Sequence, residues 1–354
     1  MKYLKTFENY QFNGIMQYID TGSFDNIELA FQLAKGFRLI EELCDEIERT
    51  YISLLTYDES WRLHDIKDKI EIKSKLDSED IEILKEEKVE IIKKYLIKIF
   101  EKERLTINKN PDIITDKISN LTNLKSLRII YSNLKKFPDI SRLTELEDID
   151  FSSNQIEEIP DYIQNLEKLD LLNLDDNNIK DIKPICNLKK IITLSICENK
   201  ISHIPDEIKN LKTIEQLILE YNYIEDIKNL LEIECLEVLD LGYNYGTIKE
   251  IPKSFNSNLE VLALESNNIK DISGISPSNL PKLQSLSLND NLIEELPDHM
   301  VDFEDLEYIW LVNNKLKDLP NNIGDFKGQI NIRGNEFNDI DGIKKKLKNV
   351  RHYL

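Results

Sequence analysis

Residues 169–179 read LDLLNLDDNNI, and residues 259–269 read LEVLALESNNI. In both stretches leucine stands at positions 1, 4 and 6, asparagine at position 9 and isoleucine at position 11. The pattern recurs at intervals of 21 to 24 residues, so that position 9 forms a ladder of eleven polar residues. The ladder consists of Asn110, Ser132, Asn154, Asn177, Asn199, Asn222, Asn244, Asn267, Asn291, Asn314 and Asn335. Self-similarity at this period predicts a solenoid of stacked repeats.

The repeat pattern also predicts where each side chain points. Leucines at positions 1, 4 and 6 of a short strand reach a shared core, while the ladder asparagine turns inward and bonds to backbone groups of the turn. One repeat cannot bury its own apolar face, so the strands of neighbouring repeats should pair in parallel and line a concave face. Ser132 has no amide to offer, and we therefore expect its rung to be the loosest.

Two kinds of repeat follow the ladder residues. Half carry an I/L-P pair, such as Ile159-Pro160, followed by apolar residues at helical spacing; these resemble the intracellular leucine-rich repeats of Ras-interacting scaffold proteins. The others, such as residues 179–188 and 269–275, resemble the 22-residue repeats of phosphatase-regulating proteins and bacterial internalins. The resemblance implies an α/β leucine-rich-repeat solenoid of about eleven repeats over residues 105–340. It also implies a helical turn on the convex side of the proline-bearing repeats, but it does not identify a partner.

Both ends of the array differ from the repeats. Residues 1–104 lack the ladder, and their apolar spacing predicts four helices, within residues 25–36, 37–55, 61–70 and 78–100. We interpret this region as an α-helical N-terminal cap or domain, because the open end of a solenoid must be covered; an independent binding module is the alternative. At the other end, apolar residues from Ile340 to Leu354 spaced by three and four predict a capping helix over residues 341–354.

The composition and the motif content argue against several classes of function. The formal net charge of -20 argues against nucleic acid, which needs a basic face. The sequence shows neither a secretory signal nor an apolar stretch long enough for a membrane, and its four cysteines show no metal spacing; we therefore expect a cytoplasmic, monomeric protein with no membrane contact. With four scattered histidines and no phosphate loop or nucleophile elbow, we expect neither catalysis nor cofactor nor metal.

Function should then depend on the concave face. Positions 3, 5, 7 and 8 of the ten repeats from Leu124 onward give forty outward sites, of which nine are acidic and only Arg128 and Arg333 are basic. Tyrosine and tryptophan, which are typical interface anchors, stand among the acids. The candidate partner-binding residues are Asp148, Asp150, Asp175, Asp176, Glu198, Glu220, Tyr221, Asp240, Tyr243, Glu265, Asp290, Tyr308 and Trp310.

The sequence therefore predicts a non-enzymatic scaffold that binds a basic protein segment along this face. Three alternatives stay open at this point. The resemblance to phosphatase regulators would imply a regulatory subunit of an enzyme, and the protein could act as an effector in a host cell. The acidic face could also be a merely solvated surface of a structural array.

Overall fold

The computed structural model describes residues 13, 15–37, 39–51, 78–108, 116–253 and 257–354. The chain forms two compact units, each described by itself below. The first comprises residues 1–132 with 138–146, and the second comprises residues 133–137 with 147–354.

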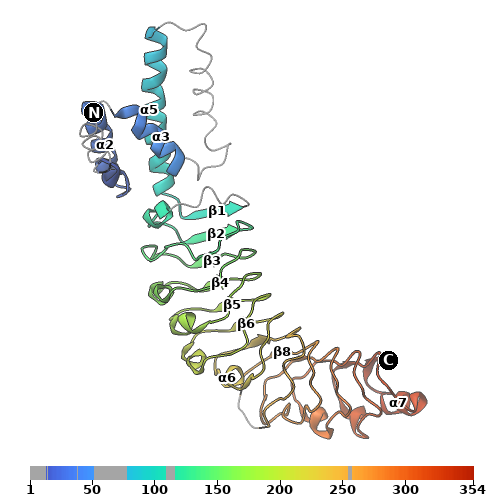
Figure 1. The fold of residues 1–354 in the computed structure, drawn as a ribbon. Helices are drawn as coiled ribbons and strands as arrows, with labels where there is room; N and C mark the ends of the chain where they lie inside the picture. The colour runs from blue at the N-terminus through green and yellow to red at the C-terminus, as the bar shows by residue number, and fades with distance from the viewer. Residues whose placement is uncertain (1–12, 14, 38, 52–77, 109–115, 254–256) are drawn as a thin grey trace. The chain divides into compact units, whose positions relative to one another are not determined.

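Among the described residues, three helices with defined bounds lie in the first part of the first unit. They are α2 (Phe24–Phe37), α3 (Ile40–Thr50) and α5 (Ser78–Phe100) (Figure 1). Their apolar stripes form a core in which Phe31, Ile47, Leu96 and Ile99 are at most 2% exposed. These helices match three of the four predicted ones, whereas the predicted helix over residues 61–70 and the end of the second, past residue 51, lie outside the described residues.

The first two repeats belong to the same unit as the helices. Strand β1 (Arg104–Asn108) pairs in parallel with β2 (Ser126–Ile130), and the short 3-10 helix η4 (Asp116–Asn120) lies between them in the chain. Burial alternates along both strands, with Leu105 opposite Leu127. The first ladder residue, Asn110, lies outside the described residues.

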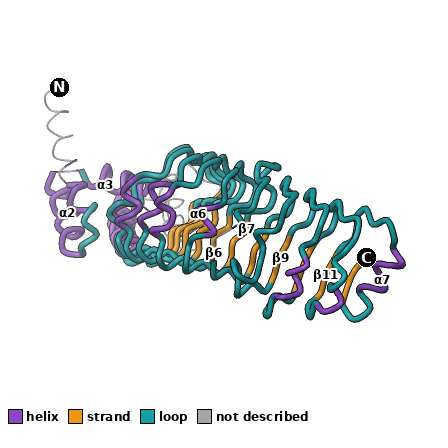
Figure 2. Tube along the Cα trace, turned by 90° about the horizontal axis from the view of Figure 1, so that it is seen from below, coloured by secondary structure: helices purple, strands orange, loops and turns teal. Residues whose placement is uncertain are grey.

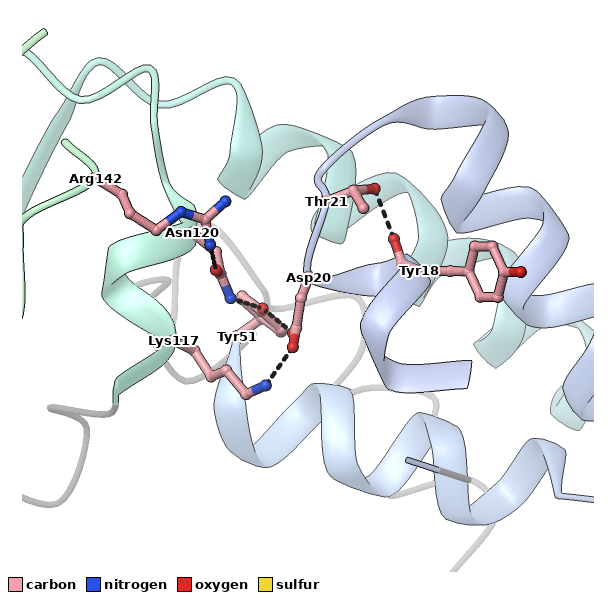
Figure 3. A network of polar contacts seen from close by, with 7 residues as sticks. All are labelled: Tyr18, Asp20, Thr21, Tyr51, Lys117, Asn120 and Arg142. Carbon is pink, nitrogen blue, oxygen red and sulfur yellow. Dashed lines mark hydrogen bonds and ion pairs between the residues drawn. The ribbon is translucent and has the colours of Figure 1, made fainter. Parts of the chain in front are cut away.

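A polar network joins the helical region to these repeats (Figure 3). The hydroxyl of Tyr51, a side chain fully buried after α3, donates to Asp20 Oδ1 at 2.6 Å and accepts from Asn120 Nδ2 at 3.0 Å. Arg142 donates to the Asn120 amide oxygen at 2.7 Å, and Lys117 forms an ion pair with Asp20 at 2.5 Å. Burial, followed by the hydrogen bond to Asp20, raises the pKa of Tyr51 and keeps its hydroxyl protonated. Both ends of the Asn120 amide are therefore engaged.

The second unit is a stack of short parallel strands. In chain order they are β3 (Asp148–Asp150), β4 (Leu171–Asn173), β5 (Thr193–Ser195), β6 (Gln216–Ile218), β7 (Val238–Asp240), β8 (Val261–Ala263), β9 (Ser285–Ser287), β10 (Tyr308–Trp310), β11 (Gln329–Asn331) and β12 (Arg351–Tyr353). Each strand pairs with the next one along the chain, and position 4 always stands opposite position 4, as in Leu172↔Leu194. The predicted parallel pairing is confirmed (Figures 1 and 2).

Helical turns lie on the side of this unit opposite the strands (Figure 1). They are η5 (Asp161–Asn165), η6 (Lys183–Asn187), η7 (Asp206–Asn210), α6 (Lys228–Leu231), η8 (Asp298–Asp302) and η9 (Ile323–Asp325). Proline directly precedes η5, η7 and η8, as predicted, but η6 and α6 occur in repeats without the I/L-P pair. There an aspartate starts the turn instead: Asp181 accepts from the Lys183 amide, and Asp226 accepts from the Lys228 amide.

The asparagines of the ladder from Asn154 to Asn314 are buried, as predicted, and Asn335 is partly exposed. Asn177 is typical: its Nδ2 donates to the carbonyls of Phe151 and Leu174 at 2.9 and 3.0 Å, and its Oδ1 accepts from the Ile156 amide at 2.9 Å. Asn177 is 7% exposed and Asn222 is fully buried. Each rung therefore ties one turn to the preceding repeat.

One asparagine rung departs from this arrangement. Asn267 Oδ1 has no hydrogen-bond partner among the described residues. In the rung of Asn177, this oxygen accepts from the amide of Ile156, two residues after the preceding ladder residue. Near Asn267, Tyr245 and Gly246 both take a positive φ, and the Thr247 amide bonds back to the Asn244 carbonyl. The backbone therefore does not present an amide to Asn267 Oδ1. Ser132, in contrast, is fully buried and its hydroxyl donates to the Ile130 carbonyl at 2.9 Å.

The C-terminal prediction is partly wrong. Helix α7 spans Ile340–Lys346, with the Asp339 carboxylate accepting from the Gly342 amide, and it does not continue to Leu354. Residues 351–353 form β12, which pairs in parallel with β11. A helical turn followed by a strand is the order found in the repeats, and it buries Leu347 and Val350 as a continuous helix would. Spacing by three and four could not distinguish the two.

Candidate functional site on the strand face

The strands of the second unit lie on the inner side of the curve that residues 147–354 follow (Figure 1). Positions 3 and 5 point outward from the strands themselves, and position 7 follows directly after. Position 8 is different, because it has a positive φ in repeat after repeat. The values for Ser153, Asp176, Glu198, Tyr221, Tyr243, Ser266, Asp290 and Asn313 lie between 51° and 56°. This left-handed residue turns the following asparagine inward, at a cost of roughly 1–2 kcal/mol for a residue with a Cβ.

Several predicted acids are engaged by neighbouring groups on the face. Asp150 Oδ1 accepts from the amide and hydroxyl of Ser152. Asp175 Oδ1 accepts from the Ser195 hydroxyl and the Cys197 amide, both at 2.7 Å, and Asp290 accepts from the Asn313 side chain at 2.8 Å. These carboxylates organise the strand face itself.

Three other acids converge on Gly242, the position 7 residue after β7. A Cβ atom at this glycine would lie 3.4 Å from Glu220 Oε1, 3.4 Å from Asp240 Oδ1 and 3.1 Å from Glu265 Cγ. Asp240 accepts from the Gly242 amide at 3.0 Å, whereas Glu265 Oε2 is buried and has no hydrogen-bond partner in the described part of the chain. The absence of a side chain at Gly242 thus leaves a notch with three carboxylates around it.

Crowding in the notch changes the acidity of these carboxyl groups. Burial, followed by repulsion from Asp240 and Glu265, raises the pKa of Glu220 to about 7. Burial also raises the pKa of Asp240 to about 6; the Gly242 amide opposes this shift, and Glu265 adds to it. A cation placed here would be stabilised by charges that now repel one another.

Two pairs of stacked tyrosines lie beside the notch in sequence. Tyr221 and Tyr243, both at position 8, have ring centroids 4.6 Å apart and planes 9° apart. Tyr223 and Tyr245 form a second stack, at 4.9 Å and 20°. The second pair stands at position 10, outside the predicted outward positions 3, 5, 7 and 8. A Tyr-Asn-Tyr motif that recurs at 221–223 and 243–245 is its signal in the sequence.

Three of the other predicted residues lie on strands away from this group. Asp148 is on β3, and Tyr308 and Trp310 are on β10, three strands beyond β7. Asp176 is exposed in its turn, whereas Glu198, which is also exposed, neighbours the group, because its amide donates to the Glu220 carbonyl at 3.0 Å. The structure therefore brings together five of the thirteen predicted residues over β6 to β8. They are Glu220, Tyr221, Asp240, Tyr243 and Glu265.

A groove at the start of the strands was also missed. Its volume is about 740 Å³. The acids that line it stand mostly at position 2, as Asp170, Glu215 and Glu237 do, and lysines such as Lys190 alternate with them. Burial, followed by repulsion from neighbouring acids, raises the pKa of Asp170. The groove is thus lined by carboxylates and ammonium groups together.

Two further observations concern the described residues alone. No group of three or more histidine, cysteine or acidic side chains among them is arranged to hold a metal ion. Within the same residues, every helix is too short or too polar to cross a bilayer.

The family model for the leucine-rich repeat matches residues 145–166, and a second leucine-rich-repeat model matches residues 257–316. Both matched segments are leucine-rich repeats. No curated protein matches it.

Solved structures of similar fold include bacterial leucine-rich-repeat proteins. The functional domain of InlJ from Listeria monocytogenes is 18% identical, with a TM-score of 0.51 over 66% of this chain and 49% of that one. A leucine-rich-repeat protein of Leptospira interrogans is 21% identical, with a TM-score of 0.39 over 73% and 92% of the two chains. An internalin, InlF, of Listeria monocytogenes is 22% identical, with a TM-score of 0.44 over 72% and 87%. At these identities the likeness concerns the fold alone.

Proposed function

We propose that this leucine-rich-repeat protein is a non-enzymatic scaffold that binds a basic segment of another protein along its strand face, with the contact centred on β6 to β8. The observation that carries the proposal is the convergence of Glu220, Asp240 and Glu265 beside the stacked pair Tyr221–Tyr243. Extended solenoid surfaces of this kind serve binding rather than chemistry.

Charge supports a basic partner. The three carboxylates come from neighbouring repeats, whose strands lie about 4.8 Å apart. No lysine or arginine stands at positions 3, 5, 7 or 8 of the repeats that contain β3 to β10. A cationic segment would supply the missing counter-charge, and its approach would be steered by the field of the face.

The tyrosines support a stable contact. Tyr243 is 38% exposed and one face of its ring is already covered by Tyr221, so the pair offers a rigid, partly apolar surface that loses little side-chain entropy on binding. Aromatic side chains in this setting are typical hot spots of protein interfaces. The acids should therefore govern attraction, and the tyrosines should govern residence time.

Fluorescence anisotropy with short labelled peptides tests the proposal. We expect the wild-type chain to bind a lysine- and arginine-rich peptide and to show no binding of an acidic peptide of equal length. Glu220→Lys should abolish binding of the basic peptide. Glu157→Lys makes the same charge change on an exposed residue in the turn after Asn154 and should leave binding nearly unchanged. Equal losses in both variants would contradict a site at β6 to β8.

A further inference from the structure

The position 8 residues of successive repeats form a row along the strand face, and this row has a small side chain next to the stacked tyrosines. Tyr221 covers one face of the Tyr243 ring, with the planes only 9° from parallel. On the other side, the position 8 residue of the next repeat is Ser266, whose side chain is too small to cover a tyrosine ring. Tyr243 itself is 38% exposed.

The row of position 7 residues lacks a side chain in the same repeat, at Gly242. Gly242 stands between Glu220 and Glu265, and any side chain there would meet both of them and Asp240. The buried oxygen Glu265 Oε2, which lacks a hydrogen-bond partner among the described residues, belongs to the same group. A planar aromatic face and an acidic notch thus lie side by side in consecutive positions of one turn.

We propose that the Tyr243 ring and this notch form a binding site for an arginine side chain of the partner, with the guanidinium stacked on Tyr243 and bonded to the carboxylates around Gly242. The inference rests on the proposed function, because it specifies the partner residue that the face would select. The surface around it, including Tyr223 and Tyr245, then contacts the rest of the segment.

Arginine fits the ring and the notch better than lysine for geometric reasons. A guanidinium is planar, stacks on an aromatic ring and presents five N–H donors in one plane, so it can bond to two carboxylates while it lies on the tyrosine. An ammonium group is a compact point charge that can occupy the notch but cannot stack on the ring. The absence of a Cβ at Gly242 leaves room for the edge of the guanidinium.

The test compares two matched peptides on the full-length chain. In one peptide the basic residues are arginines, and in the other they are lysines. We expect the arginine peptide to bind about tenfold more tightly, which is within the range that stacking and paired hydrogen bonds provide. Gly242→Ala, whose backbone φ is not in the left-handed region, should fill the notch and bring the two affinities within about twofold of each other.

Two further variants test whether the change in affinity comes from filling the notch. Gly324→Ala adds the same methyl group on the helical side of the unit and should leave both affinities unchanged. Asp240→Asn removes a notch charge without filling the space and should weaken the arginine peptide more than the lysine peptide. Thermal melting of each variant checks that the repeats remain folded.

The outcomes distinguish this inference from the proposed function. Equal binding of the arginine and lysine peptides, with Gly242→Ala affecting neither, would overturn the arginine site while leaving the basic-segment scaffold intact. Failure of both peptides to bind would overturn the proposed function together with the inference. Preference for arginine that is lost in Gly242→Ala and kept in Gly324→Ala would support the site.

Discussion

The helical region of the first unit and the strand array of the second are held by different kinds of polar contact. In the array, each asparagine rung repeats the bonds of its neighbours, as Asn177 and Asn222 do. In the helical region the bonds among Asp20, Tyr51 and Asn120 occur once. Redundant contacts allow one rung to be imperfect, as at Asn267, whereas a single network has no substitute.

Removal of residues 1–104 should have the largest effect. The helices and the first two repeats form one compact unit, and Leu105 and Leu127 of these repeats are at most 3% exposed. We expect the truncated chain to expose this apolar surface and to aggregate or to melt at a markedly lower temperature. If residues 105–354 alone remained soluble and melted as the whole chain does, the helical region would be an independent module.

Tyr51→Phe should have the next largest effect. The substitution removes one hydroxyl and leaves Asp20 Oδ1 and Asn120 Nδ2 without that partner, at a cost of about 1–3 kcal/mol in the free energy of unfolding. Urea denaturation measures the change. Tyr18→Phe is the matched control, because Tyr18 is 39% exposed and should contribute almost nothing. Equal stability of the two variants would show that the network does not fasten the helices.

Loss of a ladder amide should cost less where the rung is already incomplete. Asn222 donates to three carbonyls and accepts from the Ile201 amide, whereas Asn267 donates to three carbonyls and accepts from none among the described residues. We expect Asn222→Ala to destabilise the array by about 1 kcal/mol more than Asn267→Ala, the value of one net hydrogen bond. The reverse order in denaturation experiments would contradict the account of the ladder.

The acidic notch should give the smallest effect, a dependence of stability on pH. The pKa of Glu220 is raised to about 7 and that of Asp240 to about 6, so both groups bind protons more readily in the folded chain than in the unfolded one. Stability should therefore increase as pH falls from about 7 toward the unfolded pKa values near 4, and decrease as pH rises. Glu220→Gln should flatten this dependence in thermal melts, whereas Glu157→Gln should not.

The sequence predicted the repeated features well and the unique ones poorly. The strands, their parallel pairing and the buried asparagines follow from a pattern that occurs eleven times, so each copy supports the others. The polar network of Tyr51 and the strand β12 have no second copy in the sequence, and local spacing could not reveal them. The positive φ at position 8 was hidden because residues such as Tyr221 and Glu198, rather than glycine, occupy it.

The candidate site was predicted in part for the same reason. Register placed Tyr221 beside Tyr243 and placed the acids on one face, because strand spacing is regular. It could not show which acids would be engaged by neighbouring amides, as Asp175 is, or that Gly242 would draw three carboxylates together. Those features depend on side-chain geometry across repeats.

The affinity and rates of a basic peptide, measured at low and high salt, test the central claim most directly. Tyr221→Ala with Tyr243→Ala should weaken binding by about 2 kcal/mol or more at both salt concentrations, mainly through faster dissociation. Glu220→Gln with Glu265→Gln should mainly lower the association rate at low salt and flatten the salt dependence. Unchanged affinity in both double variants at both salt concentrations would contradict binding on this face and would direct attention to the N-terminal helices.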